Sequence, residues 1–425
     1  MKTLELIFFN AGGGHRAAAQ ALEAVMRDQH RPWRVRLVNL FEVLDSQGVF
    51  RKITGMAPED YYNRRLARGW TLGLAQELKL LQGMIRLGHA PMVRQLEAHW
   101  RAGKPDLVVS LIPNFNRALG DSLAAALPAV PFVTVMTDMA DLPPHFWVEP
   151  GLAQHIVCGT SKAVAQARAS GHGEPFIHRT SGMILRPDFY HPPPADRAAV
   201  RAELGLPAEE PTGVVLFGGH GSKRMLDIAE RLPQTPLILL CGHNRALAAR
   251  LRALPAAAPR VVVEHTPDVA RYLRLADVFI GKPGPASISE ALHCGLPVIL
   301  TRNALTMPQE RYNTDWVTEL GVGLVLKSFD SIGDAVGEVA RRLPEWRARV
   351  LGLDNRAVFE VPEILARILA ASALAQSCQA ARLERGRVAA SSRSRHAAVA
   401  PGAEHEDPCT ETCCPSNATS LLGVP

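Results

Sequence analysis

The chain has 425 residues, of which 47% are hydrophobic and 21% charged, so it holds enough apolar material for more than one globular core. Its net charge is +6 and its pI about 9.0, which suits an anionic ligand or an acidic membrane surface. No run of 18 apolar residues occurs, so the sequence does not predict a membrane-spanning helix.

Short apolar strands alternate with helical patterns in the first half of the chain. The strands are predicted at residues 4–10, 34–40, 106–112, 131–138 and 155–161, and an amphipathic helix at 17–29. Continuous apolar strands that alternate with helices are typical of a parallel sheet covered on both faces. We therefore predict a doubly wound α/β domain at residues 1–190.

A segment rich in proline and alanine, residues 186–213, separates this domain from a second one. The pattern of strand, glycine-rich turn and helix then restarts, in segments 213–225, 236–247, 260–266, 277–301 and 321–328. We predict a second Rossmann-like domain at 191–375, whose last helices can cross back to the first, and a ligand site in the cleft between the two. Residues 376–425 contain few large apolar residues and are predicted to form a disordered tail.

The first predicted strand, at 4–10, is followed by the sequence AGGGHRAA. Gly12, Gly14 and Ala17 have the spacing of a dinucleotide-binding fingerprint. That fingerprint requires an acidic residue at the end of the next strand, where this chain has Asn39. A nicotinamide-dependent dehydrogenase is therefore disfavoured. A turn that only binds phosphate needs glycines but no imidazole, so the presence of His15 requires another explanation.

Glycine-rich turns in the second half offer a better nucleotide site. Backbone N–H groups of such turns can approach phosphate oxygens closely, and a helix N-terminus with serine hydroxyls suits a diphosphate. The alternative is that each loop is only a tight turn between a strand and a helix. The residues predicted to contact the donor through glycine-rich turns are Gly13 and Gly14 of the first half and, in the second half, Gly218, Gly219, Gly221, Ser222, Gly242, Asn244, Lys282, Gly284, Pro285 and Ser287.

Four segments together resemble one family of enzymes. NAGGGHRAAAQAL, LLCGHNRAL, GKPGPASISEALHCGLPVIL and PQERYNTDWVTELGVGLVLKS look like the glycosyltransferases that include monogalactosyldiacylglycerol synthase and the processive diacylglycerol glucosyltransferases. The N-acetylglucosaminyltransferase that forms lipid II is a more distant relative. The resemblance runs in order across roughly residues 1–375 and implies a GT-B architecture, in which two Rossmann-like domains face each other across a cleft.

The resemblance also implies a role for individual residues. The N-terminal domain would bind an acceptor lipid and the C-terminal domain a UDP-sugar. His15, which closes the GGGH turn, would be the catalytic base, and Glu290 would bind the ribose of the donor. Gln309 and Glu310 would contact the donor sugar, with Asn313 following them in the motif.

The chain departs from this family in two places. Many relatives read AGPGT where this chain has KPGPAS, so Ala286 replaces a glycine and allows the backbone less freedom. His220 stands where an acidic or small residue is common. The resemblance therefore does not specify the donor sugar.

Sugar transfer from a nucleotide diphosphate needs a base for the acceptor hydroxyl and groups that hold the leaving diphosphate. A neutral imidazole suits the first task, so we predict His15 as the base. Asp138, at the end of the strand at 131–138, is predicted to orient His15 or to bind acceptor hydroxyls. The alternative for both residues is a structural role next to a helix or loop terminus. The chain has no D-x-D triplet, so we expect no metal and no cofactor, and inversion at the anomeric carbon by direct displacement.

Residues 61–104 form a basic and apolar stretch with a helical pattern. They include eight Arg or Lys and two Glu, so a net charge of +6 lies within them. Such a stretch is typical of an interfacial helix that meets anionic lipid, although an ordinary amphipathic helix with a solvated basic face fits too. Interleaved with these charges are the large apolar residues Tyr61, Tyr62, Trp70, Leu72, Leu74, Leu78, Leu80, Leu81, Met84, Ile85 and Leu87.

The sequence therefore predicts a hexosyltransferase at the cytoplasmic face of a membrane, peripherally bound. It would move galactose, glucose or N-acetylglucosamine from UDP to a lipid, with diacylglycerol as the first candidate acceptor. One alternative is a UDP-sugar epimerase on a similar scaffold, and another is a non-catalytic protein that binds a nucleotide or a lipid. No motif for nucleic-acid binding occurs in the chain.

Overall fold

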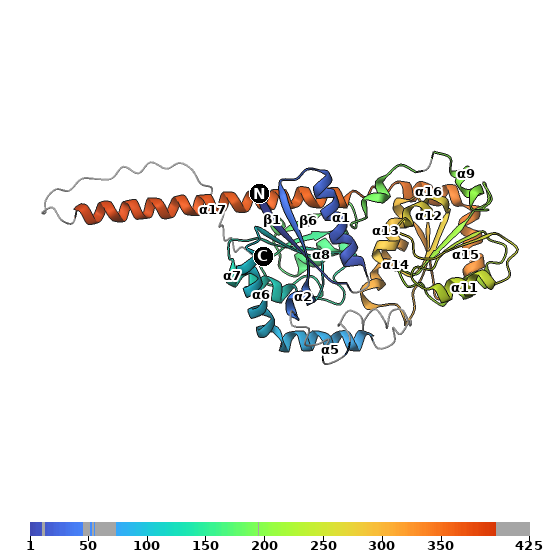
Figure 1. Cartoon of the computed structure of the whole chain (residues 1–425), viewed down its shortest axis with the longest axis horizontal. Coiled ribbons are helices and arrows are strands. Elements are labelled where there is room, and N and C mark those ends of the chain that lie inside the picture. The colour runs from blue at the N-terminus through green and yellow to red at the C-terminus, as the bar shows by residue number, and fades with distance from the viewer. Residues whose placement is uncertain (11–12, 46–51, 53–54, 56–73, 194, 397–425) are drawn as a thin grey trace, which may run out of the picture. The chain divides into compact units, whose positions relative to one another are not determined.

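The computed structural model describes residues 1–10, 13–45, 52, 55, 74–193 and 195–396. The chain divides into a unit from Met1 to Ala373 and a second unit from Leu374 to Pro425. Within the described residues, twelve strands form two sheets of six strands each, and every strand pair is parallel (Figure 1). The predicted α/β fold with two doubly wound halves is confirmed.

The first sheet has the strand order β2-β1-β3-β4-β5-β6. Its strands are β1 (Lys2–Phe8), β2 (Trp33–Asn39), β3 (Leu107–Ser110), β4 (Phe132–Val135), β5 (His155–Cys158) and β6 (Ile177–Arg179). The strand order reverses between β1 and β3, which pair in register from Leu4 opposite Leu107. Ligands of open α/β sheets bind beside such a switch point, at the carboxyl ends of the strands.

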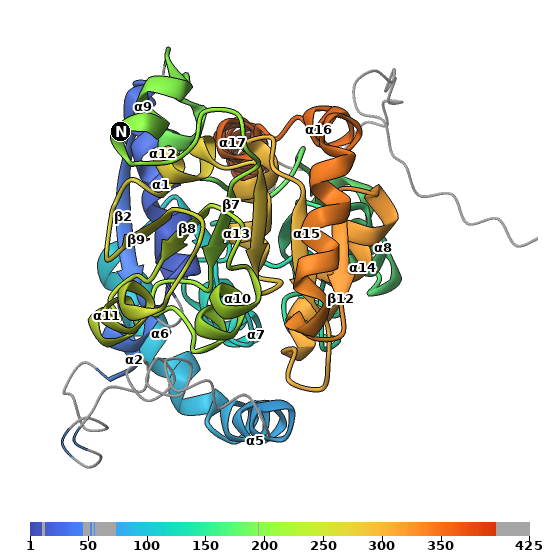
Figure 2. The same ribbon diagram turned by 90° about the vertical axis from the view of Figure 1, so that its right-hand side faces the viewer.

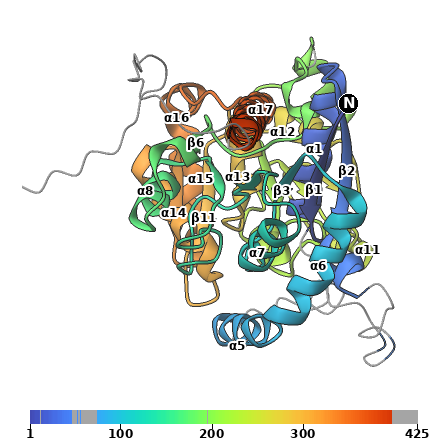
Figure 3. The same cartoon turned by 90° about the vertical axis from the view of Figure 1, so that its left-hand side faces the viewer.

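Helices cover both faces of this sheet because its strands are apolar on both sides. One face packs against α1 (Gly14–Asp28) and against the beginning of α17 (Ala357–His396), which contributes Val361 and Leu365. The other face packs against α6 (His89–Gly103) and α7 (Asn116–Ala126). The remaining helices of this half are α2 (Leu40–Leu44), α5 (Leu74–Leu87), α8 (Ser161–Ala169) and the short η1 (Glu174–Phe176). Figure 3 shows α6 and α7 beside the strands and α5 at the edge of this half.

The second sheet has the order β12-β11-β10-β7-β8-β9, which is the order of a Rossmann fold with its switch point between β7 and β10. Its strands are β7 (Gly213–Leu216), β8 (Leu237–Leu240), β9 (Arg260–Val263), β10 (Val278–Gly281), β11 (Val298–Thr301) and β12 (Gly323–Leu326). Each is a short run of Val, Leu, Ile and Phe. Such runs suit strands that are buried on both faces.

Helices also cover both faces of the second sheet (Figure 2). One apolar cluster joins the strands to α10 (Arg224–Arg231), α11 (Arg245–Ala253) and α15 (Ile332–Arg341). The other joins them to α12 (Val269–Leu275), α13 (Pro285–His293) and α16 (Leu343–Leu351). The other helical elements of this half are η2 (Pro187–Tyr190), α9 (Arg197–Glu203), η3 (Pro308–Glu310), α14 (Arg311–Leu320) and η4 (Phe329–Ser331).

Two segments connect the halves and are hydrogen-bonded to each other. The backbone N–H of Arg356 donates to the Ser181 hydroxyl at 2.7 Å, and Asn355 donates to the Met183 carbonyl at 3.0 Å. Tyr190 lies between them, with its ring 4.8 Å from the ring of Phe359. The last helix then returns to the first sheet.

Helix α17 extends through His396, into the segment 376–425 that the sequence predicts to be a disordered tail. Residues 397–425 lie outside the described residues, as do Tyr61, Tyr62, Trp70 and Leu72 of the predicted interfacial stretch. In the part of the chain that the structure describes, we find no helix long and apolar enough to cross a membrane.

Candidate active site at the carboxyl ends of the two sheets

His15 lies in the first turn of α1, at the carboxyl end of β1. The turn before it passes through Gly13 with φ of +79°, a conformation that L side chains rarely adopt, and α1 begins at Gly14. His15 Nδ1 lies 3.0 Å from Oγ1 of Thr137, which follows β4. The imidazole ring is 6.1 Å from the indole ring of Trp147. The side chain is thus held over the switch point of the first sheet.

These surroundings keep the imidazole uncharged. Burial lowers the pKa of His15 to about 4, and a hydrogen bond to the backbone of Leu111 opposes part of that shift. At pH 7 the ring is therefore neutral and has a lone pair that can accept a proton. The role of His15 as the catalytic base stays a prediction.

Asp138 follows Thr137 and is almost fully buried, with 9% of its surface exposed. Its Oδ2 accepts a hydrogen bond from Trp147 Nε1 at 2.9 Å. Burial raises the pKa of Asp138 to about 7. The bond from Trp147 opposes this shift, the charge of Glu310 adds to it, and that of Lys282 opposes it. Because Lys282 and Glu310 belong to the second half, Asp138 lies within electrostatic reach of both halves.

Sequence reasoning missed two side chains at this end of the first sheet. Asp138 is predicted to orient His15 or to bind acceptor hydroxyls, but the side chain beside His15 Nδ1 is that of Thr137. Trp147 was not singled out either, although it holds the Asp138 carboxylate. A signal for Thr137 was present in the sequence TVMTD, because the residue lies at the end of a strand beside the predicted aspartate.

The first two glycine-rich turns of the second half are joined to each other. Gly218, Gly221 and Gly242 all have positive φ, of +76°, +59° and +57°. A Cβ on Gly242 would lie 2.1 Å from the carbonyl oxygen of Gly219, so this position has no room for a side chain. Asn244 caps α11 by accepting from the N–H of Leu247 at 3.0 Å. Its Nδ2 donates to the His220 carbonyl at 3.2 Å, which ties the turn after β8 to the turn after β7.

Gly219 and Ser222 complete the turn after β7. Gly219 accepts a hydrogen bond from the backbone N–H of His243 at 2.9 Å, and the Ser222 hydroxyl accepts one from the N–H of Arg224 at 3.3 Å. These bonds fix the backbone of the turn.

The turn after β10 leads directly into α13. Gly284 precedes the helix and Pro285 is its first residue, a position that suits proline because its missing N–H has no partner to lose. Ser287 lies in the first turn of the same helix. The N–H groups at this helix N-terminus carry a partial positive charge that suits a phosphate.

A partly buried ion pair and a buried amide lie beside this turn. Lys282 Nζ is 2.8 Å from Glu310 Oε1, and Glu310 is 5% exposed. Asn313 is fully buried, and its Nδ2 donates to the Pro283 carbonyl at 2.7 Å while its Oδ1 has no hydrogen-bond partner. Gln309, next to Glu310, is half-buried. The structure therefore brings together the two predicted motifs around residues 282–290 and 309–313.

Glu290 lies on α13, about one turn beyond Ser287. Burial raises its pKa to about 7, and the charge of Arg186 opposes the shift. Arg186 comes from the segment that connects the halves, and its Nη1 donates to the Pro267 carbonyl at 2.8 Å. Sequence reasoning did not single out Arg186.

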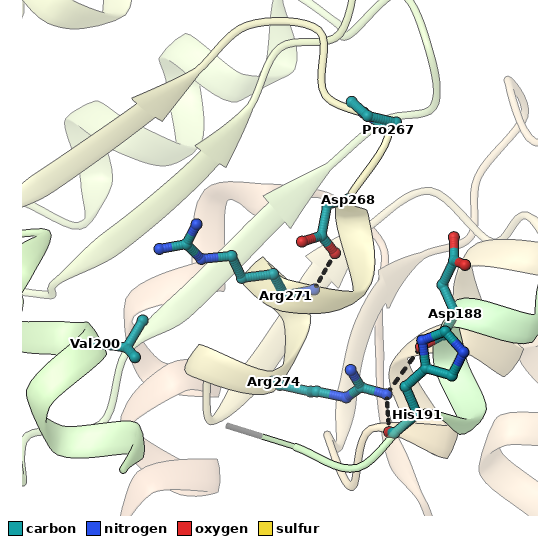
Figure 4. Close-up of a pocket in the computed structure, with 7 residues that line it drawn as sticks. All are labelled: Asp188, His191, Val200, Pro267, Asp268, Arg271 and Arg274. Atoms are coloured by element: carbon teal, nitrogen blue, oxygen red, sulfur yellow. Dashed lines mark hydrogen bonds between the residues drawn. The ribbon is translucent and has the colours of Figure 1, made fainter. Parts of the chain in front are cut away.

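A cavity of about 500 Å³ lies next to this connecting segment (Figure 4). Arg274 lines this cavity, and its guanidinium donates to the backbone carbonyls of Asp188, Phe189 and His191, at 3.0, 3.0 and 2.6 Å. Figure 4 shows the guanidinium of Arg271 extending away from these groups. A second cavity, of about 320 Å³, is lined by residues of α5, α6, α7 and the loop at 145–149. None of the predicted site residues lines either cavity.

The two strand-end regions differ in what they offer chemically. The first supplies a neutral imidazole and a buried carboxyl group, and the pKa of the carboxyl group, about 7, allows it to exchange protons near neutral pH. The second supplies backbone N–H groups, a helix N-terminus and a lysine, which can hold an anion. Among the residues described, no group of three or more His, Cys, Asp or Glu is arranged to hold a metal ion.

Comparison with known sequences finds monogalactosyldiacylglycerol synthases among the relatives of this chain. No protein family model matches the chain. Monogalactosyldiacylglycerol synthase of Spinacia oleracea is 24% identical over 376 residues, and monogalactosyldiacylglycerol synthase 1 of Arabidopsis thaliana is 25% identical over 368. The matches cover 81% and 79% of this chain. The resemblance to these synthases is confirmed. The chain spans just under two thirds of their length, 66% and 64%.

Comparison with solved structures identifies the fold. MurG of Acinetobacter baumannii has a TM-score of 0.54 at 14% identity and covers 86% of this chain and 100% of its own. The calicheamicin glycosyltransferase CalG4 has a TM-score of 0.52 at 16% identity and covers 87% and 99%. S. aureus MnaA, solved with UDP, has a TM-score of 0.52 at 14% identity and covers 84% and 92%. The chain has the GT-B fold.

Proposed function

We propose that this GT-B chain is an inverting glycosyltransferase that moves a hexose from a UDP-sugar to a lipid, with diacylglycerol as the acceptor. The observation that carries the proposal is the similarity to monogalactosyldiacylglycerol synthases over about 80% of the chain. Those relatives bear the name of an enzyme that joins galactose to diacylglycerol. The donor hexose proposed here is galactose, glucose or N-acetylglucosamine.

The geometry at the strand ends supports this chemistry. In the proposed reaction, the oxygen of the acceptor hydroxyl attacks the anomeric carbon of the sugar. The bond from that carbon to the diphosphate breaks, and UDP leaves with the electron pair. His15 takes the hydroxyl proton, which its neutral state at pH 7 permits. The glycine-rich turns and the N-terminus of α13 stabilise the charge that grows on the diphosphate.

The donor is assigned to the second half. The turns after β7, β8 and β10 offer N–H groups to the diphosphate, and Glu290 is placed on the same helix to accept the ribose hydroxyls. Gln309 and Glu310 would contact the sugar. The S. aureus structure with UDP, which has the same fold, supports a uridine nucleotide as the donor.

The acceptor and the membrane are assigned to the first half. Helix α5 has two apolar faces: Leu78 and Ile85 pack against the core of this half, whereas Leu80, Met84 and Leu87 are 64%, 54% and 89% exposed. The exposed three follow a spacing of four and three residues, so they form one stripe along the helix. A stripe of this kind next to basic residues supports peripheral binding to an anionic membrane surface.

The first test is transfer of radiolabel from UDP-galactose, UDP-glucose and UDP-N-acetylglucosamine, each offered separately with diacylglycerol in lipid vesicles. We expect label in the organic phase from one donor, and we expect it to persist in EDTA because no metal is proposed. The anomeric configuration of the product should be opposite to that of the donor.

Other results would redirect the proposal. Label that stays in water while the donor changes into a second UDP-sugar would indicate an epimerase. Binding of UDP with no reaction of any donor would indicate a binding protein. Loss of transfer in EDTA that Mg²⁺ restores would overturn the metal-independent mechanism alone.

A further inference from the structure

Two neighbouring polar side chains follow β4, and each has a different partner. Thr137 Oγ1 lies 3.0 Å from His15 Nδ1. Asp138 Oδ2 accepts from Trp147 Nε1 at 2.9 Å. The carboxylate that sequence reasoning paired with His15 is thus held by an indole, and a hydroxyl lies in the place expected for it.

We infer that Thr137 is the residue that positions His15, by accepting a hydrogen bond from Nδ1–H and so leaving the lone pair of the neutral ring on Nε2. The inference rests on the proposed transferase activity. A neutral imidazole carries its hydrogen on one nitrogen only, so only that nitrogen can donate. The ring also forms a hydrogen bond to the backbone of Leu111, whose carbonyl can only accept. The inference therefore requires that Thr137 and Leu111 both accept from the same Nδ1–H. Thr137 is a positioning residue here, because it acts through His15 and does not itself touch the acceptor.

The uncharged hydroxyl of Thr137 affects the pKa of His15 differently from a carboxylate. A carboxylate next to an imidazole favours the charged ring, whereas a hydroxyl contributes no charge. His15 therefore combines a fixed ring orientation with a low pKa, which burial sets. In the transfer step, Nε2 receives the proton of the acceptor hydroxyl while Nδ1–H keeps its bond to Thr137.

The structure also provides a matched control three residues earlier. Thr134 lies on β4 and is fully buried, and its hydroxyl has no hydrogen-bond partner. Replacing it with valine removes a hydroxyl of the same kind without touching His15. Loss of an unpaired buried hydroxyl is expected to leave stability unchanged or slightly higher.

The test compares Thr137→Val, Thr137→Ser and Thr134→Val in the full chain. We expect kcat to fall about tenfold in Thr137→Val with the KM values of donor and acceptor unchanged, since one hydrogen bond to the base is lost. Thr137→Ser keeps the hydroxyl and should stay within threefold of the wild type. Thr134→Val should do the same.

A second measurement reads the tautomer without any substrate. The protein is labelled with ¹⁵N-histidine, and the His15 resonance among the 15 histidines is identified by its loss in His15→Gln. We expect the Nδ1–H form in the wild type, in Thr137→Ser and in Thr134→Val. In Thr137→Val the Nε2–H form should appear.

The outcomes separate this inference from the proposed function. An Nε2–H ring in the wild type, or the same tautomer in the wild type and in Thr137→Val, would overturn the inference even if sugar transfer is confirmed. A fall of kcat that is equal in Thr137→Val and Thr137→Ser, with no change of tautomer, would reduce Thr137 to a packing role. If the wild type transfers no sugar, the proposed function fails, and with it the catalytic role of Thr137. The NMR spectra would then still show whether Thr137 fixes the ring.

Discussion

At the carboxyl end of the first sheet, the groups available for chemistry belong to side chains, whereas at the end of the second sheet most belong to the backbone. His15 and Asp138 both have pKa values displaced by burial, in opposite directions, and each is held by a neighbouring side chain. The second end consists of glycines with positive φ and the N-terminus of α13.

The difference shows how a fold built twice from one pattern can divide a reaction between its halves. Proton transfer needs a titratable group in a fixed orientation, which only a side chain can supply. Holding a diphosphate needs several N–H donors close together, which glycine turns and helix termini supply at little steric cost. Substitutions in the first half should therefore change turnover, and those in the second half should change donor binding and folding.

The largest effect is expected from His15→Ala. Removal of a general base should lower kcat by about 10²- to 10⁴-fold. The Kd for UDP, measured by calorimetry, should not change, because the donor is assigned to the second half. Arg16→Ala, at the next and exposed position of α1, is the control and should stay within threefold of the wild type. Turnover near the wild-type level in His15→Ala would remove His15 from the role of base.

Next come two glycine substitutions that compare the turns of the two halves directly. Gly242→Ala would place a Cβ 2.1 Å from a backbone oxygen at φ of +57°, and should cost about 3 kcal/mol of unfolding free energy. Gly13→Ala has a φ of +79° but no atom within 4 Å of the new Cβ, so it should cost about 1 kcal/mol. Urea denaturation measures both. Equal costs would mean that the turn after β8 can relax, contrary to its packing here.

The membrane assignment predicts a third difference between the halves. Replacing Leu80, Met84 and Leu87 of α5 with serine should weaken binding to anionic vesicles about 30-fold, because three partly inserted apolar side chains are lost. Leu351→Ser is the matched control, since Leu351 is 73% exposed on α16 of the second half. Co-sedimentation with vesicles measures both. A similar loss in the two variants would argue against α5 as the contact surface.

The smallest effect is expected in the pH dependence of stability. The pKa of Asp138 is about 7 in the folded chain, above its ordinary value of 3.8, so the folded state keeps a proton that the unfolded state releases between about pH 4 and 7. The free energy of unfolding of the wild type should therefore decrease as pH rises through this window. Asp138→Asn has no such titrating group, so between pH 5 and 8 its free energy of unfolding should rise by roughly 1–2 kcal/mol relative to that of the wild type.

The pH dependence of stability that His15 contributes has the opposite sign to that of Asp138. The folded pKa of His15, about 4, lies below its ordinary value of 6.5, so its contribution to stability is present above pH 6.5 and is lost as pH falls toward 4. Urea denaturation at several pH values of Asp138→Asn and His15→Gln should show opposite slopes relative to the wild type. Parallel slopes would contradict the burial of one of the two groups.

Much of the fold could be predicted from the sequence because its signals are local. Apolar runs such as LILL and VFIG fix the strands, and Gly13, Gly218 and Gly242 lie where turns between a strand and a helix require positive φ. Since parallel strands present their carboxyl ends at one edge, the sequence also placed His15 and Asp138 on the same edge of the first sheet.

The sequence by itself therefore determined which residues stand at the strand ends, but only the tertiary structure decided their partners. Thr137 rather than Asp138 reaches His15, Trp147 comes back from a loop to hold Asp138, and Lys282 pairs with Glu310 from 28 residues away. Strand and turn signals depend on a few consecutive residues. Side-chain pairing depends instead on the path of loops whose conformation is set by packing and hydrogen bonds with distant parts of the chain.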